Sequence, residues 1–96
     1  SAWTPERKVK QRLRSTLVMA SPAATLQLAQ WPADLGAVRL SLDSADIDLG
    51  TTRRTDDSIF YAVSARVAGR PALLTIGVLR DFDRDSTATL TDLRPR

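Results

Sequence analysis

The residues best placed to do chemistry are four aspartates near the end of the chain. They occupy the first, third, fifth and twelfth positions of a single segment: Asp81, Asp83, Asp85 and Asp92. Carboxylate oxygens are the ligands that Ca²⁺ takes from proteins, and this spacing can surround one ion. The spacing therefore predicts a calcium site built from these four side chains.

The same spacing resembles the calcium loop of EF-hand and dockerin-type modules over residues 81–92. Ser86 stands where those loops use glycine for a sharp bend, and Ala88 replaces a larger apolar residue. The preceding residues alternate like a strand, whereas an EF-hand has a helix there. The alternative interpretation is a hairpin turn whose exposed aspartates oppose edge-to-edge strand pairing.

The composition removes the side chains on which most catalytic sites depend. The chain has 96 residues and contains no histidine and no cysteine. Imidazole is the usual general base near neutral pH, and a thiolate is the usual ligand of structural zinc. Histidine-dependent triads, cysteine nucleophiles and zinc–thiolate sites are therefore excluded. We predict a protein that is not an enzyme and that requires no cofactor.

A basic segment near the start of the chain is the clearest charged feature. Five cations fall within residues 7–14: Arg7, Lys8, Lys10, Arg12 and Arg14. They could contact nucleic-acid phosphates or lipid headgroups, or they could form the solvated face of an amphipathic helix. No zinc-finger or RNP-like motif accompanies them. Nucleic-acid binding through this segment is the alternative function.

The strongest structural pattern is a long hairpin over residues 58–82. Apolar side chains alternate on both arms, which is typical of strands with one buried face. A turn at Gly69-Arg70 predicts pairing of Val63 with Ile76. The opposite face carries three larger apolar side chains that we predict to contact a partner: Phe60, Leu73 and Leu79.

The remaining elements follow from caps and hydrophobic spacing. Thr4-Pro5 predicts a helix start, and apolar spacing continues that helix to about residue 20. Residues 22–30 favour a second helix, with a strand as the alternative. Alternating side chains predict a strand over residues 37–42 and a final strand over residues 87–93. The expected fold is a single α+β domain over residues 1–96, with an N-terminal amphipathic helix, or two, packed on a four-stranded antiparallel sheet built around the 58–82 hairpin.

Taken together, these features predict a protein-interaction domain that binds another protein or a second copy of itself. Richness in arginine and alanine, with little lysine and no asparagine, indicates a GC-rich bacterial source. The chain starts Ser-Ala, which we interpret as a trimmed or processed piece of a longer protein. No run of apolar residues is long enough to cross a membrane. We therefore expect the soluble part of a bacterial envelope or secretion-associated protein, periplasmic or extracellular.

Overall fold

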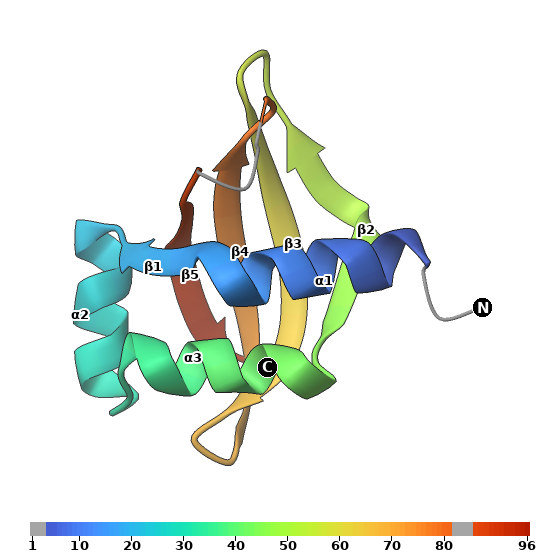
Figure 1. The fold of residues 1–96 in the computed structure, drawn as a ribbon. Coiled ribbons are helices and arrows are strands. Elements are labelled where there is room, and N and C mark those ends of the chain that lie inside the picture. Colours follow the sequence, from blue (N-terminus) through green and yellow to red (C-terminus); the bar gives the residue numbers. More distant parts are fainter. Residues whose placement is uncertain (1–3, 82–85) are drawn as a thin grey trace.

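A computed structural model describes residues 4–81 and 86–96 of the chain. Three α-helices, one 3₁₀ turn and five strands lie within these residues (Figure 1). In chain order they are α1 (Pro5–Thr16), β1 (Leu17–Ala20), α2 (Pro22–Gln30), α3 (Leu35–Ser41), the 3₁₀ turn η1 (Leu42–Ser44), β2 (Asp46–Arg54), β3 (Ser58–Val67), β4 (Arg70–Leu79) and β5 (Ala88–Pro95).

The described strands form one mixed sheet in the order β1-β5-β4-β3-β2. Strands β2 to β5 pair antiparallel, and β1 joins β5 in parallel. The predicted α+β class is confirmed, but the predicted four-stranded antiparallel sheet lacks β1. The first helix ends at Thr16, and Leu17 becomes a buried strand residue opposite Ala88. Long-range pairing with β5 outweighs the helical spacing of the apolar residues here.

The segment around residues 37–42 is helical, so the predicted strand there is wrong. Asp34 caps this helix, since its Oδ1 accepts a hydrogen bond of 2.8 Å from the backbone N–H of Ala37. Val38 and Leu42 are both buried at helical spacing, whereas Leu40 is 64% exposed. The predicted helix over residues 22–30 is confirmed.

The hairpin between β3 and β4 forms with a register two residues from the predicted one. Ala68 and Gly69 occupy the turn with φ of 50° and 80°, the positive values that a type I′ turn needs at both positions. Val63 consequently pairs with Leu74 instead of Ile76. A shift of two residues keeps every side chain on its predicted face, because side chains alternate with a period of two.

Helices α1 and α3 lie across one face of the sheet, and α2 stands beside the β5 edge, as Figure 1 shows. The core between the two layers is made by apolar side chains from both. Its largest fully buried members are Leu13, Leu17, Val38, Leu42, Val67, Leu74, Ile76 and Leu90. Among the described residues, no helix is both long and apolar enough to span a membrane.

Trp31 links the end of α2 to the turn between β3 and β4. The indole is buried, and its Nε1–H donates a 2.8 Å hydrogen bond to the carbonyl of Val67. The Arg70 guanidinium lies 4.0 Å from the centre of the indole ring and donates to the Trp31 carbonyl. These contacts hold the helical layer and the hairpin together at one end of the domain.

Side chains bond backbone groups of both outermost strands, β2 and β1. On β2, a bulge follows Asp48, whose Oδ1 accepts from the N–H groups of Gly50 and Thr51 at 3.0 and 3.2 Å. On β1, Arg39 donates a 3.2 Å hydrogen bond to the carbonyl of Leu17. These bonds hold the β2 bulge and tie the start of β1 to α3.

Candidate interaction face

The sheet face that points away from the core carries the candidate site, and we call it the open face. Cross-strand pairing arranges its side chains in rows that run across the strands. The rows are Asp46, Ser64, Leu73 and Arg94 (the Leu73 row); Asp48, Ala62, Thr75 and Asp92 (the Ala62 row); Arg53, Phe60, Gly77 and Thr89 (the Phe60 row); and Ser58 with Leu79 (the Leu79 row).

The three predicted partner-binding residues all lie on the open face. Leu73 is 39% exposed and Leu79 is 57% exposed, while Phe60 is half-buried. Phe60 and Leu79 line a hollow of about 500 Å³ together with hydroxyl side chains of β5. Leu73 lines a second hollow of about 390 Å³, which also contains Asp48. The face therefore mixes apolar side chains with small and polar ones.

Phe60 lies across the neighbouring strand and covers Gly77. A Cβ atom added to Gly77 would lie only 3.1 and 3.2 Å from two carbons of the Phe60 ring. The Arg53 guanidinium lies 4.9 Å from the centre of the same ring. Sequence reasoning missed Arg53 and Gly77, because their pairing with Phe60 depends on the hairpin register and on the bulge in β2.

Gly77→Ala is expected to displace the Phe60 ring and to lower the free energy of unfolding by about 1–2 kcal/mol. In a Phe60→Ala background the same change is expected to cost much less, because the ring is already gone. Urea unfolding of the four variants measures this coupling as a double-mutant cycle. If Gly77→Ala lowered the free energy of unfolding equally in both backgrounds, Phe60 and Gly77 would not be in energetically coupled contact.

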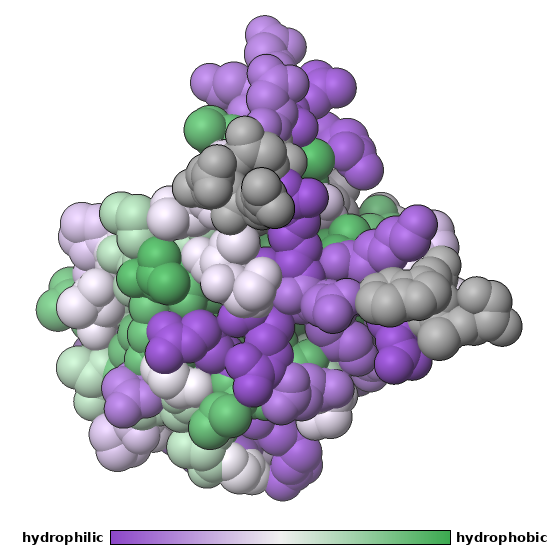
Figure 2. Space-filling view, viewed as in Figure 1, coloured by the Kyte–Doolittle hydropathy of each residue, from purple (hydrophilic) through white to green (hydrophobic). Residues whose placement is uncertain are grey.

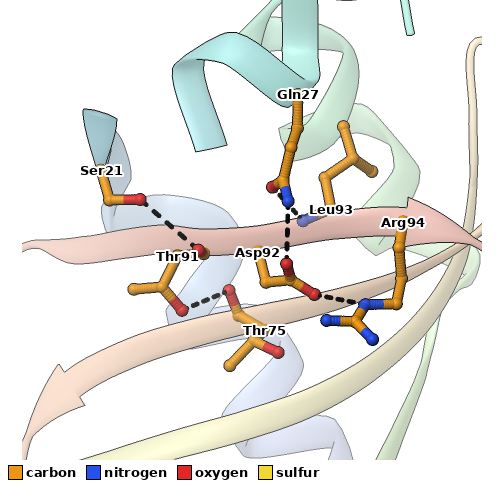
Figure 3. A network of polar contacts seen from close by, with 7 residues as sticks. All are labelled: Ser21, Gln27, Thr75, Thr91, Asp92, Leu93 and Arg94. Carbon is orange, nitrogen blue, oxygen red and sulfur yellow. Dashed lines mark hydrogen bonds and ion pairs between the residues drawn. The ribbon is translucent and has the colours of Figure 1, made fainter. Parts of the chain in front are cut away.

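A polar network fixes the edge of the open face at β5 (Figure 3). The Gln27 amide on α2 donates to Asp92 Oδ1 at 2.9 Å and accepts from the Leu93 N–H at 2.7 Å. Arg94 donates to Asp92 Oδ2 at 2.8 Å. Thr91 lies in the bulge beside them, and its hydroxyl donates to the Thr75 carbonyl at 3.3 Å. The network therefore connects α2 to the irregular part of β5.

This network lowers the pKa of Asp92. Burial by itself would raise that pKa, but the hydrogen bonds from Arg94 and Gln27 outweigh it and hold the pKa below 3.8. Because the pKa of Asp92 is lower in the folded state than in the unfolded state, the ionised carboxylate stabilises the fold when the pH is above the unfolded-state pKa. This stabilisation is lost as the pH falls through the folded-state pKa.

We therefore expect the melting temperature of the wild type to fall more than that of Asp92→Asn between about pH 5 and pH 2. The asparagine variant cannot titrate at this position, so it removes the contribution of Asp92 from the pH profile. Thermal unfolding followed by circular dichroism measures both profiles. Parallel profiles for the two proteins would contradict the lowered pKa.

The predicted calcium residues are only partly described by the structure. Asp83 and Asp85 lie outside the described residues, and Asp81 is exposed. Asp92 lies on β5 with its carboxylate bonded to Gln27 and Arg94. Within residues 4–81 and 86–96, no three or more His, Cys, Asp or Glu side chains form a group that could hold a metal ion. The calcium site stays a prediction.

The basic segment forms most of α1, but its cations differ in their contacts. Lys10 donates a 2.8 Å hydrogen bond to the Ala45 carbonyl, and Arg14 pairs with Asp43. Arg12 also makes an interaction within the chain, whereas Arg7 and Lys8 are exposed. Figure 2 shows hydrophilic side chains gathered over α1 on this face of the molecule.

A groove of about 560 Å³ runs beside α1 and η1 on this side of the molecule. It is lined by cations of α1 together with Glu6 and Asp43, so charges of both signs face it. Glu6 also accepts a 3.1 Å hydrogen bond from the Ile47 N–H at the start of β2. The groove therefore serves in part to attach α1 to the sheet.

No family model, curated protein or solved structure matches this chain.

Proposed function

We propose that this chain is a non-enzymatic protein-interaction domain that binds its partner through the open face. One observation carries the proposal: α1 and α3 cover one face of the sheet, while the other face presents the exposed Leu73 and Leu79 and the half-buried Phe60. Apolar side chains gathered on one exposed face commonly mark a binding surface. Leu73 and Leu79 already bury about half of their surface, so covering the rest of each would contribute roughly 0.5–1.5 kcal/mol to binding.

The surroundings of these side chains support the same function. Serine and threonine hydroxyls and charged groups surround the apolar positions, and interfaces typically have an apolar centre with a polar rim. The lack of histidine and cysteine supports the non-enzymatic part of the proposal.

Nucleic-acid binding through α1 is the second candidate and has weaker support. Lys10 and Arg14 already have partners within the chain. Binding to phosphates would have to rely mainly on Arg7 and Lys8 and would weaken steeply with salt. Fluorescence anisotropy with a labelled oligonucleotide at low salt tests this candidate, with Arg7→Gln and Lys8→Gln as variants.

We also propose that the domain belongs to a bacterial envelope or secretion-associated protein. The arginine- and alanine-rich composition supports a bacterial source. Fractionation of cells that express the parent protein would test the compartment.

Site-specific photo-crosslinking in cells that express the parent protein tests the interaction function. A photoreactive phenylalanine analogue at Leu79 is expected to give one specific adduct. The matched control is the same analogue at Leu40, which is 64% exposed but lies on α3, which crosses the opposite face of the sheet. Mass spectrometry identifies the adduct. Equal or absent crosslinking at the two positions would overturn the proposal.

A further inference from the structure

We propose that the partner on the open face is a second copy of this chain. This inference rests on the proposed function and adds the identity of the partner. The two sheets pack face to face about a two-fold axis that runs across the strands. The axis lies midway between the Phe60 row and the Ala62 row of the open face.

Such an axis turns each strand end for end and places it over the same strand of the copy. The Phe60 row then lies over the Ala62 row, and the Leu79 row lies over the Leu73 row. Successive positions on one face of a strand are about 6.7 Å apart, so the rows repeat at a common spacing. Both overlaps can therefore form together.

The overlapping rows match in size, polarity and charge. Leu79 meets Leu73 of the copy, so two of the exposed leucines cover each other. The ring of Phe60 lies above Gly77 on β4, so it meets the short side chain of Thr75, the β4 residue of the copy's Ala62 row. A two-fold axis forms every such pair twice, so each match counts double.

Charge complementarity follows the same rows at the β2 edge. Arg53 belongs to the Phe60 row and Asp48 to the Ala62 row, so opposite charges face each other across the axis. At β5, the hydroxyl of Thr89 faces the carboxylate of Asp92, which the network around Gln27 keeps ionised. Matched charges fix the register of an interface and steer its formation.

The size of the face sets the expected strength of the dimer. Four strands about 4.8 Å apart and four rows about 6.7 Å apart span a flat area of roughly 500 Å² per copy. The extra surface of the protruding side chains is not included in this area. This area lies at the low end of specific interfaces. We therefore expect a dimer with a micromolar dissociation constant.

Sedimentation equilibrium of the purified chain at concentrations up to about 0.5 mM tests the inference. Leu73→Lys and Leu79→Asp are each expected to raise the dimer dissociation constant at least about a hundredfold, because each places two mismatched pairs in the interface. An equimolar mixture of the two variants is expected to dimerise again. In the mixed dimer, one lysine faces one aspartate and the other leucine pair is intact.

Leu26→Asp and Leu40→Asp are the matched controls, since these leucines are 69% and 64% exposed on α2 and α3 and belong to none of the four rows. Both control variants are expected to dimerise like the wild type. A monomeric wild type, a mixture that stays monomeric, or a control variant that dissociates would each overturn the inference. A Leu79 crosslink to a different protein would overturn the inference that the partner is a second copy, but it would leave the proposed interaction function intact.

Discussion

Trp31→Ala is expected to lower the free energy of unfolding by about 3–5 kcal/mol, a large share of what a small domain possesses. The substitution leaves a cavity where the buried indole packs between the helical layer and the sheet. It also removes the hydrogen bond to the Val67 carbonyl and the surface on which Arg70 stacks. Urea unfolding followed by circular dichroism measures the loss.

Trp31→Phe provides the matched control for this result. Phenylalanine keeps much of the apolar volume but cannot donate to the Val67 carbonyl, so a smaller loss of about 1–3 kcal/mol is expected. If alanine and phenylalanine destabilised the protein equally, packing of the indole would not be the main contribution.

Leu17→Ala is the second substitution with a large expected effect, a loss of about 2–5 kcal/mol. Leu17 is fully buried where α1 passes directly into β1, and it lies opposite Ala88 of β5. Its truncation removes core packing and weakens the parallel pairing of β1. We therefore expect the substitution to accelerate amide hydrogen exchange, relative to the wild type, more in β1 and the last turn of α1 than in β3 and β4.

The adjacent position supplies the control, because Val18 is half-exposed on the same strand. Val18→Ala is expected to change the free energy of unfolding by no more than about 0.5 kcal/mol. A similar acceleration of exchange in both variants would show that burial at residue 17 does not hold β1 in place.

Several elements could be predicted because their signals are local. Thr4 and Ser21 cap their helices through side-chain oxygens, and a proline follows each of them. Alternation along β3 and β4 assigned Leu73 and Leu79 to the outward face, and a register error of two residues left that assignment unchanged. The candidate residues were therefore within reach of sequence reasoning.

Other features could not be predicted because distant contacts decide them. β1 forms because Leu17 and Ala20 find partners on β5, about seventy positions away along the chain. The rows of the open face depend on a positive φ at Ala68 and on a bulge in β2 that offsets Arg53 from Asp48. Neither feature has a sequence signal strong enough to fix it.

The way in which two sheets associate decides whether further copies of this chain can be added. Strand addition at an edge creates a new edge, so it can propagate into fibrils. Here Asp48 and Arg39 bond backbone groups of the two outermost strands. A contact between open faces about a two-fold axis consumes both faces and leaves none for a third copy. The dimer proposed above would therefore stop at two chains.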